Sequence, residues 1–148
     1  MWTALFYCAV EMKTKPCLTF DDCKKIMDGC IAEALAHKWP VTIAIVDDGG
    51  HLLMLDRLDG AAPSSAEIGP GKARMAALGR RETKGYEDII NGGRFAFLSA
   101  ASATAMRGVM MEGAVPIMVE GQCVGAVGVS GVKSAEDAQV ARAGIAAL

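Results

Sequence analysis

The chain has 148 residues, a formal net charge of −2 at pH 7 and a hydrophobic fraction of 52%. This length predicts one domain with a sizeable core. The slightly acidic balance, the scattered Lys and Arg residues and an aromatic content of 5% argue against a nucleic-acid-binding protein. The high apolar content is typical of a chain that buries surface against copies of itself or around a ligand.

The N-terminal stretch differs from the rest of the chain. Residues 1–11 are apolar, but they lack the basic n-region and the cleavage site of a secretory signal, and they are too few to span a bilayer. We therefore expect an N-terminal extension over residues 1–17, a single domain over 18–148, a cytoplasmic location and no membrane partner.

The five cysteines contain no C-x-x-C pair and no zinc-ligand spacing. This pattern predicts a reducing compartment, with the thiols used as small core residues. The cysteines are Cys8, Cys17, Cys23, Cys30 and Cys123.

The first predicted elements are a helix and a hairpin. Thr19 to Asp22 forms a variant of the capping box, and apolar residues then recur at helical spacing as far as Leu35. Residues 41–46 are almost wholly apolar, which predicts a strand buried on both faces. Asp48-Gly49-Gly50 predicts a tight hairpin turn, after which a second strand begins at His51.

The middle of the chain is predicted to be helical. Gly69 and Pro70 suit the N-cap and first position of a helix that runs to about Arg81. We expect a helical turn over residues 86–91, and residues 99–111 are also compatible with a helix.

The last predicted elements are a second hairpin and a helix. The hairpin spans residues 116–131 and turns at Glu120-Gly121-Gln122. Because Pro116 lacks an amide donor, its strand is expected to lie at an edge of the sheet or to begin at Pro116. Ser134 begins an Ala-rich terminal helix. Helices before, between and after two hairpins predict an α+β fold, in which helices cover an antiparallel sheet.

Two histidines are the candidate metal ligands. His51 lies beside the first turn, where an imidazole can ligate a metal or haem iron, or transfer a proton near neutral pH. His37 lies at the end of the first helix and can ligate iron or interact with the helix dipole. Structural roles for both histidines remain open. A divalent-metal site is an alternative, formed by Asp47, Asp48, Asp56 and Asp59.

Two further segments are candidate anion sites. Lys72 is expected in the first turn of its helix, where free amides favour a carboxylate. Gly128, Ser130 and Gly131 precede the terminal helix, and their amides can also hold an anion. Two structural alternatives remain: Lys72 can be a solvated lysine without a ligand, and the glycines can serve for close packing.

These motifs together resemble the GlcG/HbpS-like family, which is described as haem-binding or haem-degrading and also occurs as the C-terminal domain of PduO-type adenosyltransferases. The likeness covers residues 18–148 and rests on four segments in the same order. They are Val41–Leu52, Arg57–Gly60, Gly71–Arg74 and Val115–Gly131.

The resemblance implies a profilin-like α/β/α sandwich with a five-stranded antiparallel sheet, assembly into a homo-oligomer, and haem or a related ligand. The sequence departs from the family pattern at Gly69-Pro70, in the longer segment from Ala100 to Gly113, and at Ala114. These changes border the expected pocket, so they bear on the identity of the ligand.

Our first hypothesis is a domain that binds haem or another planar acidic ligand. In it, His51 or His37 approaches the iron, and Lys72 with the amides of Gly128, Ser130 and Gly131 neutralises the propionates. The alternative is an enzyme of small-molecule catabolism that acts on a hydroxy acid, a carbonyl compound or an aromatic-derived intermediate. There His51 is the acid/base, and Lys72 and Arg57 hold a carboxylate. A third hypothesis is a structural assembly partner without a ligand.

Overall fold

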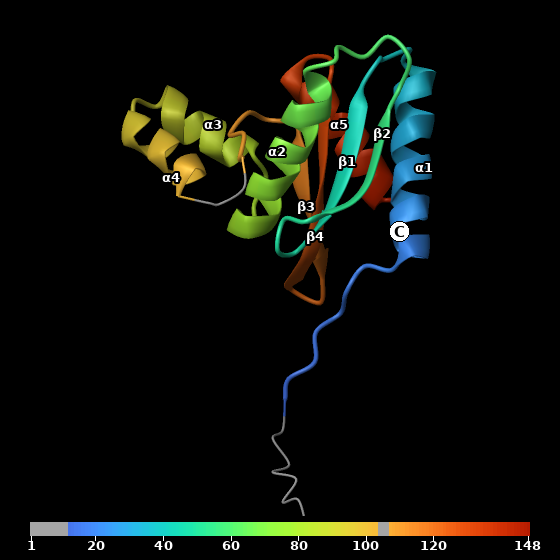
Figure 1. The fold of residues 1–148 in the computed structure, drawn as a ribbon, viewed down its shortest axis with the longest axis horizontal. Helices are drawn as coiled ribbons and strands as arrows, with labels where there is room; N and C mark the ends of the chain where they lie inside the picture. The colour runs from blue at the N-terminus through green and yellow to red at the C-terminus, as the bar shows by residue number, and fades with distance from the viewer. Residues whose placement is uncertain (1–11, 104–106) are drawn as a thin grey trace, which may run out of the picture.

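The computed structural model describes residues 12–103 and 107–148, in which an antiparallel sheet lies between two layers of helices (Figure 1). The sheet has four strands in the order β2-β1-β4-β3. The α+β class is confirmed. The predicted five-stranded sheet is wrong for the described residues, because the segment between the second and third strands forms helices and loops and adds no fifth strand. The strands are β1 (Thr42–Asp47), β2 (Leu52–Arg57), β3 (Ala114–Val119) and β4 (Gln122–Ser130).

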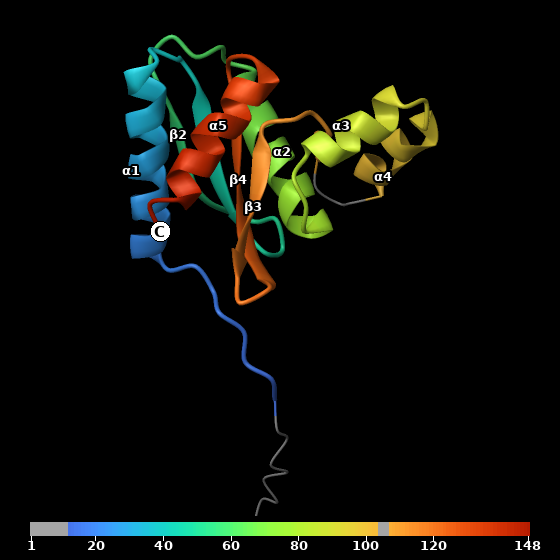
Figure 2. The same cartoon turned by 180° about the vertical axis from the view of Figure 1, so that it is seen from behind.

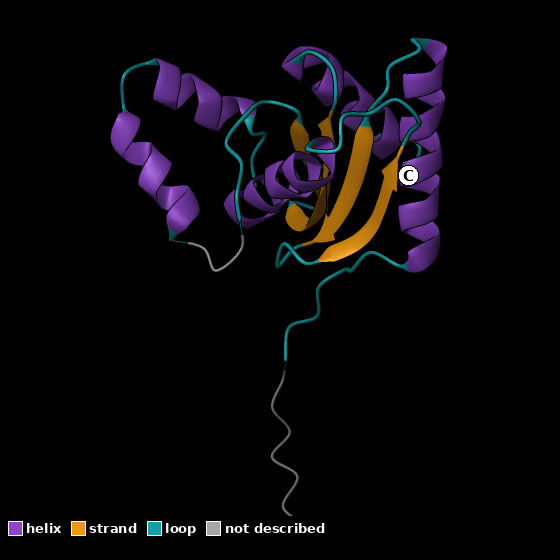
Figure 3. Cartoon of the chain, turned by 45° about the horizontal axis from the view of Figure 1, so that its top comes forward, coloured by secondary structure: helices purple, strands orange, loops and turns teal. Residues whose placement is uncertain are grey.

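The helices divide into two layers and an arm. Helices α1 (Phe20–Ala36) and α5 (Ser134–Ile145) pack against each other on one face of the sheet, and α2 (Ser65–Gly79) covers the other face. Figures 2 and 3 show the remaining helices beyond α2, away from the sheet. This helical arm comprises α3 (Lys84–Asn91), the short 3-10 helix η1 (Phe95–Phe97) and α4 (Leu98–Ser102).

The two faces of the sheet carry side chains of different size. The face toward α1 and α5 packs large residues such as Ile43, Ile45 and Val127. The face toward α2 packs small ones, among them Ala126, against Ala73 of the helix. Strand β1 is therefore buried on both sides, as its apolar run predicts.

Helix α2 begins at Ser65, so the prediction that it begins at Pro70 is wrong. The Ser65 hydroxyl donates to the carbonyl of Ala62 and lies 2.6 Å from the Thr42 hydroxyl, which anchors the first turn. Pro70 removes one helical hydrogen bond. It is nevertheless buried, as are Gly69, which faces β1 and β4, and Gly71, which faces Val109.

The two hairpin turns differ. The β3–β4 turn has two residues, and Glu120 and Gly121 adopt φ angles of 49° and 76°, as a type I′ turn requires. The β1–β2 connection is longer than the predicted tight turn, because β1 ends at Asp47 and β2 begins at Leu52. Strand β3 lies at the edge of the sheet, which confirms the placement of Pro116.

The predicted helical turn over 86–91 is confirmed as part of α3. The helix considered for residues 99–111 extends only to Ser102, and described residues 107–111 are neither helix nor strand. Residues 104–106, and the apolar stretch 1–11, lie outside the described part of the chain. In the ranges that are described, no helix is long and apolar enough to cross a membrane.

The described cysteines should differ sharply in their reactivity. Cys17 is exposed, whereas Cys23 and Cys30 lie in the core, where burial raises the pKa of Cys30 to about 12. The Cys30 thiol is then almost entirely protonated at pH 8, and the thiolate is the reactive form. We expect iodoacetamide to modify Cys17 in the folded protein, and Cys30 only after unfolding, as measured by peptide mass spectrometry. Equal labelling of the two before denaturation would contradict this assignment.

Candidate functional site

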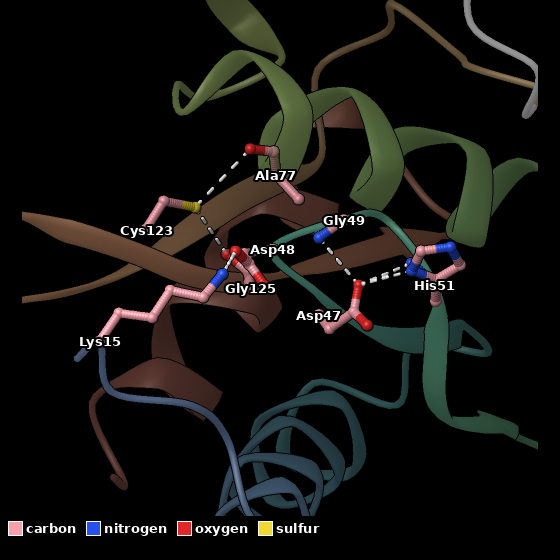
Figure 4. Close-up of polar contacts among 8 residues, drawn as sticks. All are labelled: Lys15, Asp47, Asp48, Gly49, His51, Ala77, Cys123 and Gly125. Atoms are coloured by element: carbon pink, nitrogen blue, oxygen red, sulfur yellow. Dashed lines mark hydrogen bonds and ion pairs between the residues drawn. The ribbon is translucent and has the colours of Figure 1, made fainter. Parts of the chain in front are cut away.

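The candidate site lies at the first hairpin, where one carboxylate organises the turn (Figure 4). Oδ1 of Asp47 accepts hydrogen bonds from the backbone amides of Gly49 and His51, each at 2.9 Å. The same oxygen lies 3.2 Å from Nδ1 of the His51 ring. Gly50 has a φ of 82°, which allows the chain to reverse here. The turn therefore fixes the histidine beside the carboxylate.

His51 is accessible from solvent. Its side chain is 67% exposed, and the Asp47 contact involves only Nδ1. In the described part of the chain, Nε2 makes no hydrogen bond. A carboxylate that accepts from Nδ1–H selects the tautomer in which Nε2 carries a free lone pair. The geometry therefore offers Nε2 to a metal or a proton.

Positive charge also lies at this end of the molecule. Lys15, in the segment before α1, forms a hydrogen-bonded ion pair with Asp48. This hydrogen bond lowers the pKa of Asp48 from its ordinary value, and the charges of Lys15 and Arg80 act in the same direction. Neither cation was a candidate from the sequence, because the contact joins segments far apart in the chain.

Cys123 lies on the other side of Asp47 from His51 in Figure 4. Its thiol donates to the backbone carbonyls of Gly125 and Ala77, at 3.3 and 3.7 Å. These contacts direct the sulfur toward α2. The thiol is satisfied by the backbone, and nothing pairs it with His51.

His37 lies at the opposite end of β1, as the C-cap of α1. Its ring stacks on Trp39, with the ring centroids 4.3 Å apart. Nε2 of His37 lies 3.2 Å from a carboxylate oxygen of Glu33 and 3.4 Å from the Gln139 side chain. The two histidines therefore cannot act on one ligand within a single chain, and Nε2 is open only in His51.

Lys72 is not where the sequence predicts it. Because α2 begins at Ser65, Lys72 lies within the helix and not in its first turn. Its side chain is 2% exposed, and Nζ donates to Asp137 at 2.8 Å and to the carbonyl of Val129 at 3.1 Å. Burial raises the pKa of Asp137, and the hydrogen bond and charge of Lys72 oppose that shift. Lys72 therefore joins α2 to α5 and does not face solvent.

The other predicted site residues lie at the far end of the sheet from His51. Thr42 of β1 pairs with Arg57 on one side and Ser130 on the other. Gly128 is paired within the sheet and packs against α2. Arg57 therefore does not join Lys72 and His51 in one carboxylate clamp. Gly131 lies at the same end, next to Pro40 and Val41.

The acidic residues considered as a divalent-metal site are also separated. Asp47 and Asp48 lie at one end of the first hairpin, and Asp56 lies near the other end of β2. Across residues 12–103 and 107–148, no cluster of three or more His, Cys, Asp or Glu side chains has the geometry of a metal site.

Comparison with known proteins identifies the family. The family model described as haem-degrading protein HbpS-like matches residues 18–146. The chain belongs to the HbpS-like family. GlcG of Escherichia coli strain K12 is 52% identical over 119 residues, which cover 80% of this chain and 85% of GlcG.

Solved structures of HbpS-like proteins share the fold. The crystal structure of HbpS has a TM-score of 0.82 and 27% identity, and the match covers 93% of this chain and 94% of that one. The crystal structure of a PduOC–haem complex has a TM-score of 0.81 and 26% identity, with 90% and 96% of the two chains covered. Haem binding is thus supported for the family.

Proposed function

We propose that this chain binds haem, or a related planar acidic ligand, with Nε2 of His51 as the iron ligand. The Asp47–His51 contact carries the proposal. Histidines that ligate metals almost always donate the other ring N–H to a carboxylate, a carbonyl or water, which fixes the ring and raises its basicity. Asp47 supplies that carboxylate at 3.2 Å, and the ring is exposed to an incoming ligand.

The charged residues near His51 fit an acidic ligand. Haem carries two propionates, which cations stabilise by charge-assisted hydrogen bonds. Lys15 and Arg80 supply positive charge at this end of the molecule. They replace Lys72 in our hypothesis, because the Lys72 side chain is buried whereas that of Lys15 is 58% exposed. Within this proposal, bound haem supplies the redox chemistry, and the chain binds and orients it.

The proposal is tested by titrating the purified full chain with haem and following the Soret band. We expect His51→Ala to change the position of this band and to weaken haem binding by at least about tenfold, since an axial ligand is lost. His37→Ala is the matched control, because the His37 ring already contacts Glu33 and Trp39. An unchanged spectrum in His51→Ala would reject His51 as the ligand.

A second variant tests Asp47 separately from the ligand itself. Asp47→Asn keeps an oxygen that can accept from the amides of Gly49 and His51, so the turn should be preserved. The variant removes the negative charge beside the ring. We expect haem affinity to fall by about 10–100-fold while the Soret band keeps the wild-type position, as is typical of outer-shell changes.

The Asp47–His51 pair also favours a second candidate function, acid/base catalysis in small-molecule catabolism. A carboxylate that orients an imidazole is the usual arrangement for a general base. Arg57 and Lys72 lie away from this pair, so Lys15 and Arg80 would have to hold the substrate carboxylate. A protein that does not bind haem but is stabilised by hydroxy acids in a His51-dependent manner would favour this function.

A further inference from the structure

A cavity of about 360 Å³ lies at the base of the helical arm, away from His51. Its apolar lining comes from Ile90 of α3, Leu98 of α4, and Met110 and Met111 before β3. Leu98 is 54% exposed and Met111 48% exposed, although both are large and apolar. Methionine side chains adapt to ligands of irregular shape. The cavity is thus suited to an apolar group that displaces water from these side chains.

The polar lining of the cavity includes the Glu87 carboxylate, whose charge acts on Lys84 only at a distance. Oε2 of Glu87 accepts from the backbone amide of Glu112 at 2.6 Å, which holds the side chain in place. No ion pair to Glu87 exists within the described residues. The nearby Lys84 is paired with Asp88 at 2.7 Å. A negative charge therefore lies at an apolar cavity, where it can attract a cationic ligand.

The helix end on the other side of the cavity does not make it a site for anions. Ser134 lines the cavity at the start of α5, where a helix normally favours anions. Two carboxylates already occupy that position: Glu136 accepts from the amide of Lys133, and Asp137 accepts from the amide of Val132. These carboxylates are balanced by Lys133 and Lys72, so Glu87 is the charged side chain that lines the cavity within the described residues.

We propose that this cavity binds an organic cation: an amine carried on a small apolar body, with its ammonium group at Glu87. The apolar body contacts Ile90, Leu98 and the two methionines, and the ammonium donates to the free oxygen of Glu87. The site is separate from the proposed haem site, since the Glu87 carboxylate repels propionates and His51 does not line the cavity.

The experiment compares three ligands of matched size by isothermal titration calorimetry with the full chain. They are 2-phenylethylamine, 2-phenylethanol and 3-phenylpropanoate, which carry positive, neutral and negative polar ends. We expect the amine to bind about tenfold more tightly than the alcohol, the range for a charge-assisted hydrogen bond, and the carboxylate to bind most weakly. Equal affinity for the amine and the carboxylate would overturn the proposal, as would failure of all three to bind.

Two variants locate the binding. Glu87→Gln retains an oxygen that can accept from the Glu112 amide, so the fold should hold while the preference for the amine over the alcohol disappears. Leu98→Arg places bulk and positive charge at a half-exposed position and should abolish binding of the amine. Glu120→Gln, in the β3–β4 turn, is the matched control and should leave the affinities unchanged. A wild-type amine preference in Glu87→Gln would reject Glu87 as the recognition group.

Discussion

Lys72→Met is expected to lower the free energy of unfolding by about 3–5 kcal/mol, the range for breaking a buried ion pair. The substitution leaves the Asp137 carboxylate 2% exposed and without its cation. It also removes the hydrogen bond from Nζ to the carbonyl of Val129. Since Lys72 belongs to α2 and Asp137 to α5, the loss affects the contact between the two helical layers. Urea denaturation followed by circular dichroism measures the change.

Two further variants distinguish this mechanism from a general effect of removing a lysine. Lys133→Met changes a lysine whose side chain is 86% exposed and 3.9 Å from Glu136, so it should cost less than about 0.5 kcal/mol. The double variant Lys72→Met with Asp137→Leu replaces both charges by apolar groups and should recover more than half of the loss. If the double variant is less stable than Lys72→Met, an unpaired buried carboxylate is not the cause.

Gly128→Ala is expected to destabilise the protein by about 3 kcal/mol, at the upper end of overpacking effects. A Cβ atom at Gly128 would lie 2.3 Å from the carbonyl oxygen of Gly69 and 2.6 Å from the backbone nitrogen of Ala73. Both are backbone atoms of α2, so the helix as a whole must move away from the sheet. That movement also loosens the alanine contacts that pack α2 against β1 and β4.

The matched control is Gly85→Ala, in helix α3. Among the described residues, a Cβ at Gly85 meets only Cδ of the flexible Arg81 side chain, at 3.8 Å. Alanine favours a helix over glycine by roughly 1 kcal/mol, so this variant should be neutral or stabilising. Thermal unfolding monitored by calorimetry compares the two variants. Equal melting temperatures for Gly128→Ala and the wild type would show that α2 does not need this close approach.

Local sequence patterns predicted the features that depend on neighbouring residues. Thr19 and Asp22 form the capping box expected of them. The apolar run of β1 is buried on both faces, and Pro116 lies in an edge strand. His37 caps its helix and His51 lies beside the first turn, both as predicted. Each of these features follows from helix, strand or turn chemistry over a few positions.

The features that sequence reasoning missed depend on tertiary packing. Gly69 and Pro70 resemble the start of a helix, but α2 begins earlier, at Ser65, whose hydroxyl contacts Thr42 of β1. Lys72 resembles a solvent-exposed anion site until α5 brings Asp137 to it. The role of Asp47 had a local signal: an Asp two residues before a glycine can accept that amide and form a turn.

The pairing of β1 with β4 affects how freely the segment between them can change in length during evolution. Strands β1 and β4 are neighbours, with Asp47 opposite Gly125, although β2, α2 and the helical arm lie between them in the chain. For so long a connection, the entropy of loop closure changes slowly with length, and even a doubling costs only about 0.6 kcal/mol. Insertions and deletions in the arm therefore place little thermodynamic burden on the sheet. Evolution can remodel the walls of the arm cavity while β1 and β4 keep their register and His51 keeps its place.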